Sequence, residues 1–320
     1  MRILVVGAGA IGGYFGGRML AAGRDVTFLV RPRRAAQLAA TGLAIKSAKG
    51  DVAQAAPPVI LADQLRAPFD LIVLSCKAYD LENAIASFAP AVGPRTAILP
   101  LLNGMQHLDT LEARFGKEAV LGGQCIIAAT LDPAGTILHL NTDHQLTFGE
   151  RGGTSSDRVR AIAGAMEGAL FEHRLSDRIL LEMWEKWVFL AALAGGTCLM
   201  RASIGEIIAA PRGRDIMLNL LEECRMTAAA NRFEPRGDFM TRCRSVLTAP
   251  GSSLTASMLR DMERQAPIEA DHILGDLIRR QKGSEAPAAG VSLLTLAYAH
   301  LKAYEARLQR PSGSAAPRPR

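Results

Sequence analysis

The sequence predicts an N-terminal α/β domain, built on a doubly wound parallel sheet, and a second domain that is entirely α-helical. Up to about residue 125, short apolar runs alternate with helical segments, which is the pattern of βαβ units. After Ser176 the strand-like runs stop, and long segments with a helical apolar period follow. We therefore expect one domain over residues 1–176 and the helical domain over residues 177–310. From Pro311 onward, the Pro-, Ser- and Arg-rich composition predicts a disordered tail.

The elements of the first domain follow from apolar runs of strand length. We expect buried strands at residues 2–6, 26–30, 69–76 and 96–102. Helices are expected from about residue 10 and over residues 81–89 and 105–115. Between residues 120 and 149 the runs shorten and are separated by turn sequences, so this stretch predicts antiparallel strands that complete the same sheet.

Four long segments with helical periodicity predict the second domain. They cover residues 177–200, 213–231, 254–282 and 291–308. The third segment contains Pro267, which has no backbone donor and should break or kink the helix at that point.

The first strand ends in a glycine-rich loop. Gly7, Gly9 and Gly12 have the spacing G-x-G-x-x-G. Gly7 suits the tight turn, Gly9 lets the backbone approach a pyrophosphate, and Gly12 lets the next helix pack on the strand. A helix that starts near Ala10 and Ile11 would point its first N–H groups at that anion. The order of strand, glycines and helix predicts a dinucleotide-binding domain of the Rossmann type, the alternative being a purely structural turn.

The residue after the second strand indicates which dinucleotide binds. Sites for NAD usually place Asp or Glu there, to accept hydrogen bonds from the ribose. This chain has Arg31, closely followed by Arg33 and Arg34, and no acidic residue occurs between Asp25 and Asp51. A guanidinium binds a 2′-phosphate through two hydrogen bonds. We therefore expect NADPH/NADP+ as cofactor, the alternative for Arg31 being an ordinary solvated basic loop.

Composition narrows the class of protein. The net charge is +6, but the basic residues are scattered, which favours an anionic small molecule over nucleic acid. The five cysteines are dispersed without a C-x-x-C pair, as in proteins with reduced thiols, and the six histidines show no metal-ligand spacing. No apolar stretch is long enough to cross a bilayer, and the N-terminus is occupied by the first strand. We expect a cytoplasmic enzyme with no metal, nucleic-acid or membrane partner; a homodimer stays open.

Lysine is rare, with seven Lys against thirty Arg, and two of the lysines stand out. Lys77 follows the third expected strand at its carboxyl end, where ligands bind in open α/β sheets. Lys186 lies in a strongly apolar helical stretch, where an ammonium is costly unless it is paired or used in proton transfer. The alternatives are a loop cation at residue 77 and a Lys186 whose ammonium extends into solvent.

Five short motifs, in order and spacing, resemble those of the ketopantoate reductases (2-dehydropantoate 2-reductases). The motifs are Gly7-Ala8-Gly9-Ala10-Ile11-Gly12, Cys76-Lys77-Ala78, Asn103-Gly104-Met105, Glu185-Lys186-Trp187 and Ser257-Met258-Leu259-Arg260-Asp261. The resemblance runs from residue 1 to about residue 308. It implies an NADPH-dependent reductase of a 2-oxo acid, with the substrate held between a Rossmann domain and a helical domain.

The resemblance also implies roles for individual residues. Lys186 is similar to the general acid that protonates the ketone oxygen as hydride arrives at carbon. Glu269 resembles a second essential polar residue that also contacts substrate, and Ser257 a substrate-binding serine. Asn103 resembles an asparagine near the nicotinamide and the substrate, while Arg31 and Lys77 match cofactor positions. These roles fit the chemistry, because an ammonium stabilises the charge that develops on a ketone oxygen and supplies its proton.

The chain departs from the family where the substrate is held. Asparagines typical of the family are replaced here by Leu190, Ala194 and Ile204, and a further one by Leu254. Aliphatic substrate-binding positions at 190 and 194 favour a less polar ligand than ketopantoate. Three functions therefore stay open: a 2-dehydropantoate 2-reductase of pantothenate biosynthesis, a related reductase of a more apolar 2-oxo acid or ketone, and a non-catalytic NADP(H) sensor.

Overall fold

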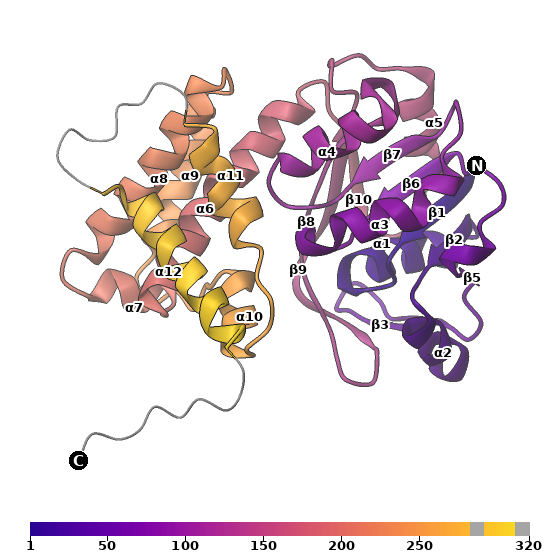
Figure 1. The fold of residues 1–320 in the computed structure, drawn as a ribbon, viewed down its shortest axis with the longest axis horizontal. Coiled ribbons are helices and arrows are strands. Elements are labelled where there is room, and N and C mark those ends of the chain that lie inside the picture. The colour runs from indigo at the N-terminus through magenta and orange to yellow at the C-terminus, as the bar shows by residue number, and fades with distance from the viewer. Residues whose placement is uncertain (282–290, 311–320) are drawn as a thin grey trace. The chain divides into compact units, whose positions relative to one another are not determined.

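The computed structural model describes residues 1–281 and 291–310, and the predicted tail from Pro311 lies outside the described residues. The chain divides into two compact units, Met1–Met183 and Trp184–Arg320. The first unit contains two sheets and the second is helical, which confirms the predicted fold class (Figure 1). The contact-based division falls within a helix, seven residues after the domain boundary expected from the sequence.

A five-stranded, fully parallel sheet forms the base of the first unit. In spatial order its strands are β5 (Val59–Ile60), β2 (Asp25–Leu29), β1 (Arg2–Val6), β6 (Leu71–Leu74) and β7 (Ala97–Pro100). The strands on either side of β1 are reached by connections that run in opposite directions, so the carboxyl end of β1 lies at the switch point of the sheet. β1, β6 and β7 are almost fully buried, which explains why their sequences are uninterrupted apolar runs.

A second, mixed sheet makes up the rest of the first unit. Its strands are β10 (Glu172–Leu175), β9 (Ile137–Gly149), β3 (Leu43–Lys46) and β4 (Val52–Gln54), with β8 (Gly122–Leu131) paired to β9. The prediction of antiparallel strands over residues 120–149 is confirmed by the β8–β9 pair, but the prediction that they complete the parallel sheet is wrong. Within the described residues, the β-pairing between this region and β7 is a single isolated bridge between Ile98 and Val120.

Five helices accompany these sheets. They are α1 (Ala10–Ala21), α2 (Pro32–Thr41), α3 (Leu81–Phe88), α4 (Gln106–Phe115) and α5 (Asp157–Met166). Helix α1 lies against both sheets through its glycines. A Cβ at Gly16 would meet Phe28 of β2 at 2.7 Å, and one at Gly13 would meet Ile137 of β9 at 2.5 Å. The glycine-rich sequence of α1 thus allows a helix to be enclosed from two sides.

All regular secondary structure among the described residues of the second unit is helical. Its helices are α6 (Ile179–Met200, which starts in the first unit), α7 (Ile204–Ala209), α8 (Gly213–Ala230), α9 (Gly237–Leu247), α10 (Ser257–Glu263), a π-helical segment (Asp271–Gly275) that continues into α11 (Asp276–Arg279), and α12 (Leu293–Leu308). The predicted helix over residues 254–282 is interrupted around Pro267, as its proline indicated.

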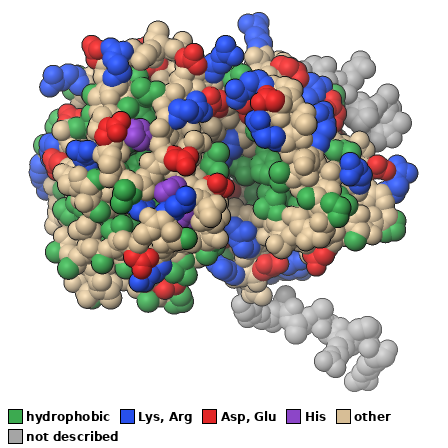
Figure 2. Space-filling model, turned by 180° about the vertical axis from the view of Figure 1, so that it is seen from behind, with side chains coloured by type: hydrophobic (Ala, Val, Ile, Leu, Met, Phe, Trp, Pro, Cys, Tyr) green, Lys and Arg blue, Asp and Glu red, His purple; other side chains and the backbone are tan. Residues whose placement is uncertain are grey.

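The described residues contain neither a membrane-spanning helix nor a cluster of metal ligands. None of the helices in residues 1–281 and 291–310 has the length and apolar character needed to cross a membrane. The same residues contain no group of three or more His, Cys, Asp or Glu side chains suited to hold a metal ion. On the face shown in Figure 2, Lys and Arg side chains are scattered and lie among acidic ones.

Candidate functional site

The carboxyl ends of four adjacent parallel strands carry the predicted cofactor residues. The glycine loop follows β1, Arg31 follows β2, Lys77 follows β6, and Asn103 follows β7. Because β2, β1, β6 and β7 are neighbours in the sheet, these segments lie along one edge. In open α/β sheets this edge, at the switch point, is where ligands bind.

The glycine loop has the geometry that the sequence predicted. Gly7 has φ +93°, a conformation that other residues rarely adopt, and its N–H donates to the carbonyl of Leu29 over 2.9 Å. A Cβ at Gly12 would lie 2.1 Å from Oγ of Ser75, so helix and strands could not approach with any larger residue there. At Gly9, by contrast, a Cβ would meet nothing within 4 Å, which leaves open space beside the backbone.

The start of α1 is suited to an anion. Its N-cap is Gly9, and no side chain caps the first turn. The first N–H groups of a helix have no partner within the helix, and they carry a partial positive charge. Together with the open space at Gly9, these groups fit the pyrophosphate of a dinucleotide.

Arg31 is exposed, as a ligand for a phosphate requires, but it already has a partner. Its NH2 lies 2.8 Å from Oδ1 of Asp80, with 69% of the Arg31 side chain and 30% of the Asp80 side chain exposed. Asp80 was missed in the sequence analysis, which considered only acids near Arg31 along the chain. It follows β6, three residues after Lys77, and the convergence of parallel strand ends could have revealed it.

Arg34, by contrast, is a structural residue. Its Nε donates to the carbonyl of Ala8 in the glycine loop over 3.0 Å, and its NH2 donates to the carbonyl of Gly135 over 3.2 Å. Burial lowers the pKa of Arg34 from its ordinary value. This guanidinium therefore joins the glycine loop, α2 and the β8–β9 turn.

In the second unit, α6 carries Lys186 between two anchored residues. Glu185 is 3% exposed in its side chain and accepts hydrogen bonds from Nε and the backbone N–H of Arg236, each over 2.9 Å. Trp187 is 1% exposed and donates from Nε1 to the carbonyl of Ile273 over 2.9 Å. Lys186 itself is half-buried. These two contacts fix the rotation of α6, and with it the direction of the lysine.

The Trp187 contact also places Glu269 near α6. Ile273, which accepts from Trp187, donates its own N–H to the carbonyl of Glu269 over 3.0 Å. The half-buried Glu269 thus begins the helical turn that is bonded to the residue after Lys186. The two predicted catalytic residues are carried by elements that a buried hydrogen bond holds together.

The segment that carries Ser257 is hydrogen-bonded to α6 at a point nearer its C-terminal end. The N–H of its neighbour Ala256 donates to Oγ1 of Thr197 over 3.3 Å. Thr197 follows Trp187 by ten residues, which is about 15 Å along α6. The exposed Ser257 and the half-buried Glu269 thus flank one helix, as the interruption at Pro267 allows.

The positions that depart from the family lie on and near α6. Leu190 and Ala194 follow Lys186 at intervals of four residues and so share one face of the helix. Leu190 is half-buried and Ala194 is 4% exposed. Ile204 and Leu254, which are far apart in sequence, are brought together by a hydrogen bond from the N–H of Ile204 to the carbonyl of Leu254 over 3.0 Å. Their roles toward a substrate stay predictions.

Comparison with known proteins gives the class and then the family. The uncharacterized oxidoreductase YkpB of Bacillus subtilis is 39% identical over 306 residues, covering 96% of this chain and 99% of that protein. A 2-dehydropantoate 2-reductase of Mesorhizobium japonicum is 25% identical over 295 residues, covering 86% of this chain and 89% of that protein. The crystal structure of 2-dehydropantoate 2-reductase from Methylococcus capsulatus has a TM-score of 0.83 at 27% identity, covering 97% of this chain and 98% of that chain. The family match and these relatives define an oxidoreductase that acts on CH–OH groups.

The family follows from two sequence models that together match most of the chain. The model described as ketopantoate reductase PanE/ApbA matches residues 3–153, and the model of its C-terminal part matches residues 178–305. The chain belongs to the ketopantoate reductase family. The resemblance noted from five short motifs is thereby confirmed.

Proposed function

We propose that the chain is a cytoplasmic, NADPH-dependent 2-oxo acid reductase that converts 2-dehydropantoate to pantoate in pantothenate biosynthesis. The observation that carries the proposal is Lys186, which two buried contacts hold on α6 beside the turn that begins at Glu269. A protein that only sensed a dinucleotide would need neither side chain.

The cofactor fits the residues of the first unit. The uncapped start of α1 and the open space at Gly9 would receive the pyrophosphate, and Arg31 would meet the 2′-phosphate. Lys77 and Asn103 would contact the cofactor from the ends of β6 and β7. When bound, the nicotinamide supplies the hydride that reduces the ketone carbon.

The remaining chemistry belongs to Lys186, Glu269 and Ser257. Lys186 would donate a proton to the ketone oxygen and stabilise the negative charge that develops there. A carboxylate at Glu269 would orient the ammonium and favour its charged form, while the hydroxyl of Ser257 would bind substrate. Asn103 would hydrogen-bond both the cofactor and the substrate.

A second candidate function is the reduction of a more apolar 2-oxo acid. It is favoured by Leu190 and Ala194, which stand where amides are expected to hydrogen-bond a polar substrate. A site built to bind a hydroxyl discriminates by about 10⁴, whereas an aliphatic site gains only about 1–3 kcal/mol per methylene.

NADPH oxidation against a panel of 2-oxo acids tests both candidates. A kcat/KM for ketopantoate near about 10⁵ M⁻¹s⁻¹ supports the first, and a clear preference for an aliphatic 2-oxo acid supports the second. Lys186→Ala is expected to lower kcat by about 10²–10⁴ while NADPH still binds. Lys186→Arg should not restore turnover, because a guanidinium does not release its proton. Near-normal turnover in Lys186→Ala would show that the proton donor is another group.

A further inference from the structure

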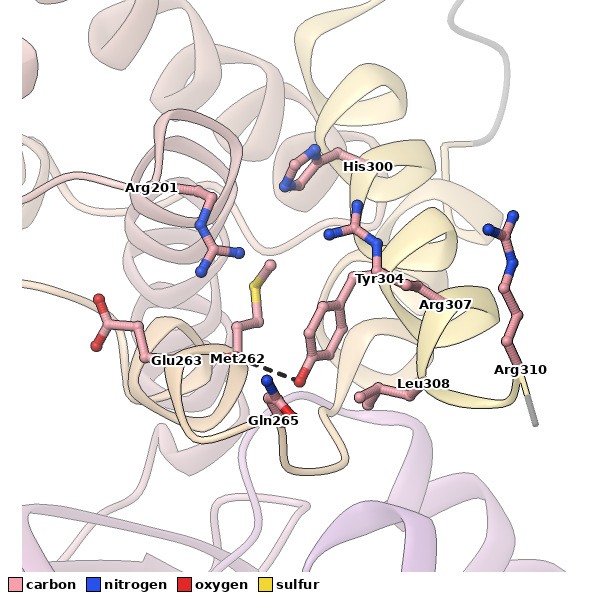
Figure 3. A pocket seen from close by; sticks show the side chains of 9 residues that line it. All are labelled: Arg201, Met262, Glu263, Gln265, His300, Tyr304, Arg307, Leu308 and Arg310. Carbon is pink, nitrogen blue, oxygen red and sulfur yellow. Dashed lines mark hydrogen bonds between the residues drawn. The ribbon is translucent and has the colours of Figure 1, made fainter. Parts of the chain in front are cut away.

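The second unit contains a cavity of about 540 Å³ that is separate from the residues discussed so far (Figure 3). It is formed where α6, α10 and α12 end, with Met262 and Tyr304 among its buried lining residues. Arg201, on its rim, follows Lys186 by fifteen residues, which is about 22 Å along α6. The hydroxyl of Tyr304 donates to the carbonyl of Ala266 over 2.9 Å and so fixes α12 to the turn after α10.

The rim of the cavity is cationic. Three arginines line it, Arg201 after the end of α6, Arg307 on α12 and Arg310 just beyond α12, against one carboxylate, Glu263 of α10 (Figure 3). Within residues 1–281 and 291–310, neither Arg201 nor Arg307 forms an ion pair. The cations outnumber the single carboxylate, so an anion placed between Arg201 and Arg307 would reduce their mutual repulsion.

His300 supplies a hydrogen-bond acceptor, whereas the arginines supply only donors. Its Nε2 is buried without a hydrogen-bond partner in the described structure. Burial, with help from Arg201 and Arg307, lowers the pKa of His300, so the ring is neutral near pH 7. A neutral imidazole has one donor and one acceptor nitrogen, so Nε2 accepts a hydrogen bond from a ligand when Nδ1 carries the proton.

We propose that this cavity binds a soluble phosphate monoester that carries hydroxyl groups. Its phosphate lies between the guanidiniums of Arg201 and Arg307, and one of its hydroxyls donates to Nε2 of His300. Two guanidiniums suit the doubly charged phosphate group, and the cavity volume is in the range of small-molecule sites. The site is independent of the function proposed above, since it uses none of the same residues.

Isothermal titration calorimetry of the full chain tests the proposal, with inorganic phosphate, glucose 6-phosphate and glucose as probes. Glucose 6-phosphate should bind more tightly than inorganic phosphate, and glucose should not bind. Arg201→Gln and Arg307→Gln should each weaken the binding of inorganic phosphate and of glucose 6-phosphate by about tenfold or more. The matched control is Arg244→Gln, which removes an exposed arginine from α9 outside the cavity and should change nothing.

Two further variants distinguish binding in this cavity from binding elsewhere on the protein. His300→Asn shortens the side chain and leaves no atom at the position of Nε2, so it should weaken the binding of glucose 6-phosphate and leave that of inorganic phosphate unchanged. Arg31→Ala, in the dinucleotide unit, should leave both probes unaffected. The proposal is overturned if millimolar phosphate does not bind, if binding survives both cavity arginine variants, or if it is lost with Arg31 instead.

Discussion

Replacing Asp80 with asparagine is expected to strengthen the binding of NADPH and to leave the binding of NADH unchanged or weaker. Oδ1 of Asp80 lies 2.8 Å from the guanidinium of Arg31, which we propose meets the 2′-phosphate. The carboxylate and the phosphate would compete for one cation, and their like charges would repel. The amide of asparagine has nearly the same shape as the carboxyl group without its charge.

The size of the effect follows from two terms. The ion pair that NADPH must displace is largely exposed, and such pairs contribute about 0.2–1 kcal/mol. A carboxylate and a phosphate of charge about −1.5, separated by about 5 Å in a medium close to water, repel by about 1 kcal/mol before salt screening. Together these terms give about 1–2 kcal/mol, or roughly a five- to thirtyfold gain in NADPH affinity.

The assay is fluorescence titration with NADPH and with NADH, at low and at high salt. Arg31→Ala should weaken the binding of NADPH by about ten- to hundredfold. Asp80→Asn should have a smaller effect on NADPH affinity in the Arg31→Ala variant than in the unaltered protein. Arg33→Ala is the matched control, since it removes an exposed arginine two residues away. An unchanged ratio of the two affinities in Asp80→Asn, or a shift toward NADH, would refute the reasoning. The gain should shrink as salt increases.

Two further predictions concern stability. Trp187→Phe removes the donor to the carbonyl of Ile273 and should lower the free energy of unfolding by about 1–3 kcal/mol, measured by urea denaturation; an unchanged midpoint would contradict the buried hydrogen bond. The guanidinium of Arg158 holds the pKa of Glu150 below its usual range. The ionised carboxyl therefore stabilises the fold at pH values above its unfolded-state pKa of about 4.3. This contribution is lost as the pH falls through the lower pKa of the folded state. Glu150→Gln should therefore cost about 1–3 kcal/mol at pH 7, and this cost should shrink as the pH falls below about 4.3; a cost that does not change with pH would contradict the linkage.

The helices and strands that could be predicted from the sequence are those with strong local signals. The strands over Arg2–Val6 and Leu71–Leu74 are buried on both faces, so their sequences are continuous apolar runs that need no tertiary context. The strands over Leu43–Lys46 and Glu172–Leu175 were not predicted. They are only four residues long, and the second consists mostly of polar residues that are at most half-buried. Their pairing with β9 depends on contacts that are distant in sequence.

The same distinction applies to the candidate site. The glycine loop is a local motif, and its geometry could be predicted from spacing alone. The partner of Arg31 could not be predicted in this way, because Asp80 is 49 residues away and approaches through the order of the strands. Similarly, the sequence marked Lys186 as unusual, but the contact between Trp187 and Ile273 spans 86 residues.

The four glycines of α1 have a consequence for how the dinucleotide site forms. Gly12, Gly13, Gly16 and Gly17 each reduce intrinsic helix stability by about 1 kcal/mol relative to alanine, and a helix of this length is marginal in water even without them. On its own, therefore, the segment would not be helical, and its first N–H groups would not point in one direction. They become aligned only when both sheets enclose the helix. Ligand binding at this loop is consequently coupled to folding of the whole first unit, and a ligand at about one hundred times its Kd would add about 2.7 kcal/mol to the stability of that unit.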